Sequence, residues 1–453
     1  MTAVRSENRI LDGAIVPTFF HFALSSVAGL LALTTASLVD GYFVGNFVGA
    51  DALASITLLI PYFTLLFGAA LMLAVGGVVS AGRALGKGEP EEASADFSKS
   101  LIATCVLSTA AMVLSSTWPN TLFTALGAPK ALHPLMLEYF RVFSVVLVLQ
   151  LGSMVLYYFV RLGGRPVLAT AGLVCGAAGN ILLDAVFVGY WGWGLAGAAW
   201  ATGAAQLLQL AVLLIYFRDP DRQLRFSLRQ RSWRSLISTA FNGVSEFINE
   251  LSAGLVIFLL NWLLVARQGV EGVAAFTVTN YLIFLSLMLF YGIADAIHLL
   301  VSQNLGAGRD DRIRQFLRVA ALVVLLLGCS LAAVLLFGRH YLAGLFLEPS
   351  DPSVTVLAAG YLAILWPLFL VNGLNVLMSV YLTAMHQPLP SALIALSRSL
   401  VLPVLILLAI AVWLPAWPLV AAIPLAEWLT FVFALLLVSR FRPGRLVQRQ
   451  IAA

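Results

Sequence analysis

Apolar runs of about 20 residues recur along the chain, separated by short polar segments. A helix of about 20 residues crosses the roughly 30 Å hydrocarbon core of a bilayer. The runs are continuous, whereas the strands of a membrane barrel alternate apolar and polar positions. The pattern therefore predicts twelve membrane-spanning helices, over residues 14–40, 52–76, 99–118, 135–160, 166–188, 193–217, 236–267, 276–303, 316–338, 354–385, 390–413 and 417–439.

The composition agrees with this pattern. Hydrophobic residues make up 61% of the chain and charged residues only 10%, against roughly 45–50% and 25% in soluble domains. The first apolar run is longer than the core of a signal peptide and is expected to be retained as a span. We therefore expect an all-α integral protein of a bacterial cytoplasmic (inner) membrane.

Basic residues occupy alternate connections between the predicted spans. One set of connections and ends carries Arg5, Arg9, Arg83, Lys87, Lys99, Arg161, Arg165, six arginines within 218–234, and the arginines of 309–318 and 440–449, whereas the opposite set carries only Lys130, Arg267 and Arg339. By the positive-inside rule, both termini are cytoplasmic. The basic residues behind the net charge of +5 therefore indicate how the chain is oriented in the lipid bilayer, and no nucleic-acid partner is expected.

A weak internal repeat relates the two halves of the chain. Five residues match without gaps at a spacing of 220: Gly49, Ala54, Thr57, Gly86 and Gly88 align with Gly269, Ala274, Thr277, Gly306 and Gly308. We predict two pseudo-symmetric six-helix lobes, over 1–217 and 236–453, joined by a cytoplasmic Arg-rich linker, 218–235. Because six is even, both halves enter the membrane from the same face, and a substrate cavity is expected between them.

Asp40 and Asp184 lie in apolar runs of the first half that contain no Lys or Arg. A carboxylate within a membrane span is by default a candidate functional group. Asn180 lies one helical turn before Asp184, on the same helix face. The direction of each span places these three residues and Thr202 at one depth, in the outer half of the bilayer. The pattern predicts a compact carboxylate site.

The residues of this site suit either of two ions, a proton or Na⁺. Burial and a like charge both disfavour two ionised carboxyls, which suits proton exchange, whereas Asp, Asn and Thr oxygens also suit Na⁺ at Asp40 and Asp184. A third interpretation is that the two aspartates bind no ion and only form hydrogen bonds with neighbouring helices. Alignment of Pro166 with Pro390 puts Val404 and Leu408 opposite Asn180 and Asp184, so the site is expected in the first half alone.

The second half carries its own polar residues, which we expect to contact substrate or to form a gate: Glu246, Glu250, Asn280, Tyr281, Asp295, Arg398 and Glu427. The carboxylates and aromatic rings suit an organic cation. In the alternative, Arg398 and His298 neutralise Glu246 and Asp295 as an ion-pair gate on the cytoplasmic side. Asn372 and Asn375 are expected to form hydrogen bonds with partner helices, or, in the alternative, with substrate.

Two other patterns exclude chemistry. Gly86-Lys87-Gly88 lacks the Ser or Thr that follows the lysine of a phosphate-binding loop. Cys105, Cys175 and Cys329 have no metal-ligand spacing. We expect no enzyme activity, no cofactor and no metal site other than the sodium alternative.

Several motifs resemble those of the multidrug and toxic compound extrusion (MATE) family, particularly its DinF-type branch. They are Val39–Asn46, Gly49–Ala54, Pro61, Val160-Arg161 with Gly164-Arg165-Pro166, Asn180–Asp184 and Gly197–Thr202. The resemblance implies an antiporter that expels drug-like molecules while protons or sodium ions move inward, with an ion site at Asp40, Asn180, Asp184 and Thr202. The chain departs from the family where Ser25 and Ser37 replace a proline and an asparagine, and Ser37 or Tyr157 is then expected as a weaker ligand.

The predicted function is therefore a proton-coupled exporter of cationic or neutral organic molecules that works by alternating access, as a monomer. The runner-up is a flippase for a lipid-linked saccharide or another amphiphile. Its cavity would need a cationic lining, whereas the second half places four acids against one arginine. A receptor or scaffold gives no reason to bury so many acids.

Overall fold

The computed structural model describes residues 9–228, 232–346 and 352–451, and all of the regular structure in these residues is helical. Within these residues, eleven helices are long and apolar enough to cross a membrane, and a bent pair, Ser353–Leu365 with Leu368–Ala384, brings the number to twelve if it is counted as one span. The predicted all-α fold is confirmed. The described residues divide into two compact units, one of residues 9–14 and 20–243 and one of residues 15–19 and 244–451.

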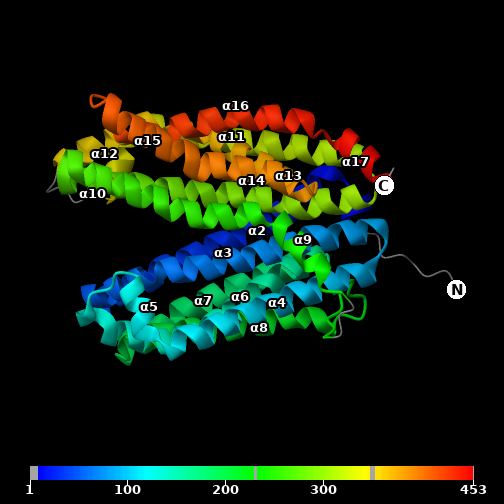
Figure 1. Ribbon diagram of the computed structural model, residues 1–453, viewed down its shortest axis with the longest axis horizontal. Helices are drawn as coiled ribbons and strands as arrows, with labels where there is room; N and C mark the ends of the chain where they lie inside the picture. Colours follow the sequence, from blue (N-terminus) through cyan, green and yellow to red (C-terminus); the bar gives the residue numbers. More distant parts are fainter. Residues whose placement is uncertain (1–8, 229–231, 347–351, 452–453) are drawn as a thin grey trace. The chain divides into compact units, whose positions relative to one another are not determined.

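The first unit is a bundle of long helices joined by short turns (Figure 1). Its elements are α1 (Arg9–Asp12), α2 (Ile15–Phe43), the π-helix η1 (Val44–Val48), α3 (Ala50–Lys87), α4 (Pro90–Thr117), α5 (Pro119–Ala125), η2 (Lys130–Leu132), α6 (His133–Leu162), α7 (Pro166–Asp184), the π-helix η3 (Ala185–Tyr190), α8 (Gly194–Leu214), η4 (Ile215–Arg218) and α9 (Arg234–Asn242). Proline starts α4, α5 and α7, where its missing N–H has no cost. The central helix is α6, which packs against α3, α4, α7 and α8.

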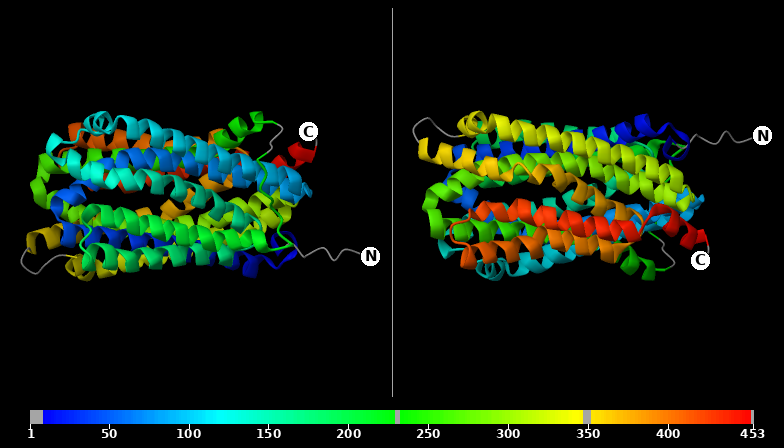
Figure 2. Two further views of the ribbon diagram at one scale, coloured as in Figure 1. Left: turned by 90° about the horizontal axis from the view of Figure 1, so that it is seen from below. Right: turned by 90° about the horizontal axis from the view of Figure 1, so that it is seen from above.

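The second unit has the same organisation. Its elements are α10 (Val244–Gly306), α11 (Asp310–Phe346), α12 (Pro352–Leu365), α13 (Leu368–Ala384), α14 (Pro388–Leu396), the π-helix η5 (Ser397–Val401), α15 (Leu402–Trp413), η6 (Leu419–Ala421), α16 (Ala422–Arg440) and α17 (Pro443–Ile451). The backbone of α10 breaks at Gly269, which divides it into two spans. Here α13 is central and packs against α10, α11, α14 and α16. Figure 2 shows both bundles from two further sides.

Backbone conformation supports the internal repeat. Gly49 and Gly269 both have positive φ angles, 120° and 65°, and both separate the first two spans of their units. Gly88 and Gly308, which follow the second span of each unit, also have positive φ angles, 83° and 70°. Positive φ strains any residue with a Cβ atom, so glycine at the same places is a structural requirement.

The structure corrects the alignment of the later spans. Pro166 begins α7, whereas Pro388, not Pro390, begins α14, so alignment of the two helix starts gives a spacing of 222. Asn180 and Asp184 then lie opposite Leu402 and Ile406. The expectation that the second half lacks the Asn–Asp pair is unchanged by this shift.

Two predicted spans differ from the structure. The span predicted over 354–385 is bent by 53° between α12 and α13, because Pro367 cannot donate a helical hydrogen bond. The span predicted over 236–267 begins only at Val244, because residues up to Asn242 form the separate helix α9. That helix packs on α3, and the carbonyl oxygen of Thr239 comes so close to Gly76 that no side chain would fit there. Of the predicted linker 218–235, residues 229–231 lie outside the described residues, as does Arg5.

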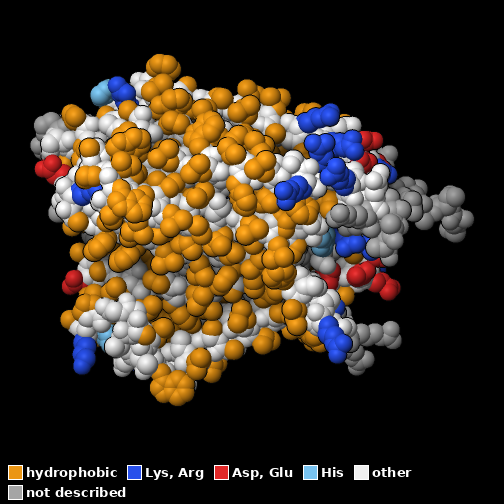
Figure 3. Space-filling model, turned by 45° about the horizontal axis from the view of Figure 1, so that its top comes forward, with side chains coloured by type: hydrophobic (Ala, Val, Ile, Leu, Met, Phe, Trp, Pro, Cys, Tyr) orange, Lys and Arg blue, Asp and Glu red, His pale blue; other side chains and the backbone are white. Residues whose placement is uncertain are grey.

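Hydrophobic side chains cover the broad face drawn in Figure 3, and Lys and Arg side chains gather near one end of the helices, where α17 lies in Figure 1. Many of the exposed side chains are large, such as Leu322, Phe337 and Val432. A soluble monomer rarely exposes an apolar surface of this extent. The surface fits a protein that is surrounded by lipid.

Candidate functional site

Both intramembrane aspartates of the first unit lie next to π-helical segments. Asp184 is the last residue of α7 and is followed directly by η3, and Asp40 lies one turn before η1. The two π-helices contact each other, and both contact α8. Single π-turns within α-helices occur frequently at functional sites.

The structure brings the four predicted ion-site residues into one region. The side chains of Asp40 and Asp184 are close enough to repel each other, and Asn180 Nδ2 donates a hydrogen bond of 3.4 Å to Thr202 Oγ1. Thr202 Oγ1 in turn donates to the carbonyl oxygen of Ala198. Asp184 is 0% exposed and Asp40 is partly buried. The site joins α2, α7 and α8.

The carboxylates of this site lack hydrogen-bond partners for most of their oxygen atoms. Oδ1 of Asp40 and both carboxyl oxygens of Asp184 are buried and have no hydrogen-bond partner within the described residues. A buried polar group without a partner costs about 1–3 kcal/mol, and more if it is charged. A bound proton or a bound cation would relieve this cost.

Tyr139 of α6 belongs to the same region, although the sequence analysis did not select it. Its buried ring stacks on Phe143, and its hydroxyl is close enough to both aspartates to interact with them electrostatically. The sequence does indicate its depth in the membrane, because Tyr139 lies near the outer end of the predicted span 135–160. One tyrosine among many aromatic residues does not stand out by residue type.

The two weaker ligands expected from the sequence do not join the site. The Ser37 hydroxyl donates to the carbonyl oxygen of Leu33 in its own helix. Tyr157 lies 18 residues after Tyr139 on the same helix, about 27 Å further along its axis. There its ring faces the guanidinium of Arg161, at 5.2 Å. The expectation for Tyr157 was therefore wrong, because it compared residue types without comparing depth.

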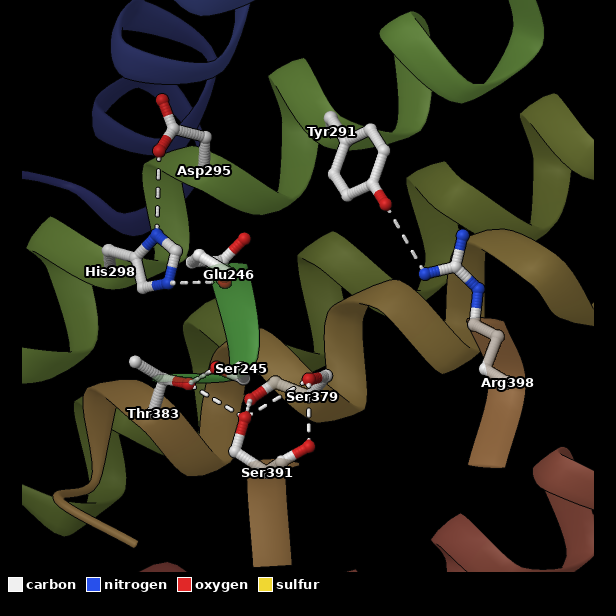
Figure 4. A network of polar contacts seen from close by, with 9 residues as sticks. All are labelled: Ser245, Glu246, Tyr291, Asp295, His298, Ser379, Thr383, Ser391 and Arg398. Carbon is white, nitrogen blue, oxygen red and sulfur yellow. Dashed lines mark hydrogen bonds and ion pairs between the residues drawn. The ribbon is translucent and has the colours of Figure 1, made fainter. Parts of the chain in front are cut away.

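The second unit holds a polar network around His298 (Figure 4). His298 Nε2 lies 3.9 Å from Glu246 Oε1, and Nδ1 lies 3.4 Å from Asp295 Oδ1. Ser245, which precedes Glu246, is hydrogen-bonded to Thr383, and Ser391 is hydrogen-bonded to both Thr383 and Ser379. This chain of hydroxyl groups joins α10 to α13 and α14, and it could not be predicted from the sequence, because it depends on contacts between distant spans.

Glu427 forms a second buried cluster in this unit. Arg398 Nε lies 2.8 Å from Glu427 Oε1, Asn372 Nδ2 donates to the same oxygen at 2.7 Å, and Asn375 Nδ2 donates to Oε2 at 2.6 Å. Arg398 also donates to the Tyr291 hydroxyl at 3.3 Å. The ion pair of Arg398 is with Glu427, which also accepts hydrogen bonds from the two asparagines of the tenth predicted span. Arg398 is also close enough to Glu246 to interact with it electrostatically.

The remaining predicted residues of the second unit are less constrained. Glu250 lies one turn after Glu246 and is close enough for repulsion. Asn280 is half-buried, and Tyr281 is half-exposed. Among the described residues, no group of three or more His, Cys, Asp or Glu side chains is arranged to hold a metal ion.

A helical bundle of this length with buried acids in its spans defines a multi-pass protein of the cell membrane. The MatE family model matches two segments, residues 26–186 and 250–408, which together form more than half of the chain. The chain belongs to the MatE family. The starts of the two matched segments are 224 residues apart and their ends 222 apart, in agreement with the internal repeat.

Relatives and solved structures extend over nearly the whole chain. The multidrug export protein MepA of Staphylococcus haemolyticus is 22% identical, with 88% of each chain covered, and an FAD transporter of Shewanella oneidensis is 26% identical, with 88% of this chain and 89% of the relative covered. The structure of a multidrug resistance MATE transporter of the MOP superfamily in an outward-facing conformation superposes with a TM-score of 0.88 at 22% identity, covering 97% and 98% of the two chains. A MOP superfamily transporter from Pyrococcus furiosus also has a TM-score of 0.88, at 21% identity, with the same coverage. The fold is that of these transporters.

Proposed function

We propose that the protein is a secondary active exporter in which protons move inward through Asp40 and Asp184 while an organic molecule moves outward. The observation that carries this proposal is the buried aspartate pair, in which Oδ1 of Asp40 and both carboxyl oxygens of Asp184 have no hydrogen-bond partner among the described residues. Protonation removes charge from these buried oxygens, and deprotonation restores their mutual repulsion. A change of this kind biases the equilibrium between two packings of the first unit.

The orientation belongs to the proposal as well. In the first unit, the turns that join α3 to α4 and α6 to α7 carry Lys87 and Arg165, and the segment after α8 carries Arg218, Arg222 and Arg225. By the positive-inside rule, this end of the unit faces the cytoplasm. Asp40 and Asp184 then lie in the outer half of the membrane.

The cargo that we propose is a cationic or neutral drug-like molecule. Three acids, Glu246, Glu250 and Asp295, lie in this region. His298 pairs with Glu246 and Asp295, and Arg398, which is close enough to Glu246 to act on it electrostatically, is ion-paired with Glu427. This excess of negative charge favours a cation. The name of the MepA relatives agrees with multidrug cargo, but the Shewanella relative transports FAD, whose phosphates are anionic, so the cargo test includes both kinds of molecule.

Transport in proteoliposomes tests the proposal. We expect a proton gradient to drive efflux of ethidium, a sodium gradient without a proton gradient to drive none, and Asp40→Asn or Asp184→Asn to reduce proton-driven efflux at least about 100-fold. Asp96→Asn is the matched control, because Asp96 is a buried acid of the same unit outside the pair. Full coupling in both variants of the pair would refute the proposed site. Efflux driven by sodium alone would assign Na⁺ as the coupling ion instead, and transport of FAD without ethidium would overturn the cargo class.

A further inference from the structure

An apolar groove runs along the outside of the first unit, over α4, α6 and α8. Its volume is about 1380 Å³, and nearly all of its lining is hydrophobic. Along α4 the lining runs from Leu101 to Trp118, or about 25 Å, which is most of the roughly 30 Å thickness of membrane hydrocarbon. The three helices lie in contact as α4–α6 and α6–α8, on the side seen in the left view of Figure 2.

Small side chains lie along the middle of this groove. The lining from α4 and α6 includes Cys105, Thr109, Ala110, Gly152 and Ser153 among larger Leu, Ile and Val side chains. Larger residues form its ends, with Trp118 at one end and Phe217, Phe226 and Leu228 at the other. The groove is therefore long and open on one side, and its shape matches an extended hydrocarbon chain.

The chain after α8 is held against one end of the groove by three backbone hydrogen bonds. The N–H of Leu224 donates to the Tyr216 hydroxyl at 3.1 Å, that of Arg225 donates to Ser94 Oγ at 3.0 Å, and that of Ser227 donates to Ser98 Oγ at 3.0 Å. The ring of Phe226, between the last two bonds, contacts Phe97 with 6.1 Å between ring centroids. This segment therefore forms a fixed rim.

The rim is cationic. Arg218 follows the lining residue Phe217, Arg225 precedes the lining residue Phe226, and both arginines are exposed. Neither has an acidic partner among the described side chains. The neighbouring Asp219 accepts the backbone N–H of Asp221 and pairs with Arg165, and these contacts lower the pKa of the Asp219 carboxyl. The Asp219 carboxyl is therefore already engaged, and residues 218–225 carry three arginines against two acids, Asp219 and the exposed Asp221.

We infer that this groove binds one anionic phospholipid, with an acyl chain lying along α4 and the phosphate at Arg218 and Arg225. The acyl chain alone cannot give selectivity, because the surrounding lipid is as apolar as the groove. Selectivity comes from the two arginines, since a basic residue near an anionic membrane surface strengthens binding roughly five-fold. The inference does not depend on the coupling ion or the cargo, because no residue of the groove belongs to the aspartate site.

Native mass spectrometry of the delipidated full-length protein tests this inference, with phosphatidylglycerol and phosphatidylcholine as probes. We expect one phosphatidylglycerol to bind at least ten-fold more tightly than phosphatidylcholine. Arg218→Gln with Arg225→Gln should remove this preference, a loss of roughly thirty-fold for two arginines. Ala110→Trp, which fills the groove, should weaken the binding of both lipids at least ten-fold.

Two variants of the second unit serve as controls. Arg440→Gln removes an exposed arginine at a helix end, and Cys329→Trp adds a ring at an exposed position of α11. Both should bind phosphatidylglycerol as the wild type does. Equal affinity for the two lipids, or a preference that survives loss of both arginines, would overturn the inference. So would tight binding in Ala110→Trp, or a dimer of the wild-type chain that Ala110→Trp dissociates, since a second copy would then fill the groove.

Discussion

Asp184 in the first unit and Glu427 in the second are both buried carboxylates in a membrane span, but their surroundings differ in kind. Glu427 has Arg398 as an ion-pair partner and the amides of Asn372 and Asn375 as donors, so both of its oxygens are satisfied. Neither oxygen of Asp184 has a hydrogen-bond partner within the described chain, and its charged neighbour is another acid, Asp40. A buried carboxylate is therefore fully bonded in the second unit, whereas the carboxylate of Asp184 has no hydrogen-bond partner among the described residues of the first.

The internal repeat makes this comparison informative. The two units share their order of helices and their positive-φ glycines, yet alignment of the helix starts puts Ile406 opposite Asp184. A common scaffold does not determine where charge is exchanged; a few side chains within it do. The difference can be tested by variants that separate stability from transport.

The largest expected effect on stability is at Glu427. Glu427→Ala leaves Arg398, which is 8% exposed, buried without its carboxylate. Loss of one partner of a buried ion pair costs about 3–5 kcal/mol, and we expect thermal unfolding in detergent to show a decrease of this size. The double variant Arg398→Met with Glu427→Leu should recover most of the loss, because it buries no charge. Wild-type stability in Glu427→Ala would show that the pair has no structural role.

A smaller loss is expected at the two repeat-related glycines. Gly49 and Gly269 adopt φ/ψ angles of 120°/175° and 65°/−155°, and no atom lies within 4 Å of the place where a Cβ would be added. The cost of Gly49→Ala or Gly269→Ala is therefore backbone strain alone, about 1–3 kcal/mol. Gly254→Ala is the control: Gly254 lies within α10 without positive φ, and alanine there should be neutral or stabilising by up to about 1 kcal/mol. Unequal losses at the two glycines would show that the units differ at this turn.

The sequence predicted the helices well, because each span must satisfy its own backbone hydrogen bonds and so leaves a continuous apolar run. It also placed Asp40, Asn180, Asp184 and Thr202 together, since depth in a membrane can be read from the direction of each span. Depth does not specify which helices are neighbours. For that reason the pairing of Arg398 with Glu427 was missed, and Tyr139 was not selected.

Errors in the boundaries had a different cause. The break at Pro367 lies within apolar sequence, so hydropathy continues across it. It depends on a missing backbone donor, which local composition does not report. The helix α9 is more polar than the span that follows it, and it packs through the close contact between Thr239 and Gly76. The alignment of Pro166 with Pro390 failed for a similar reason, because two prolines lie within three residues and only the helix start distinguishes them.

The smallest expected effect on stability is at the residue that we place at the centre of transport. Asp184→Asn keeps the shape of a protonated aspartate and removes no hydrogen bond that the described residues make to its carboxyl oxygens, so we expect its free energy of unfolding to change by less than about 1 kcal/mol. Unfolding and proton-driven efflux should be measured on the same preparation. If Asp184 binds the coupling ion as proposed, Asp184→Asn should lose efflux while it keeps its stability. A loss of several kcal/mol in Asp184→Asn would mean that Asp184, like Glu427, holds helices together, and the contrast between the two units would fail.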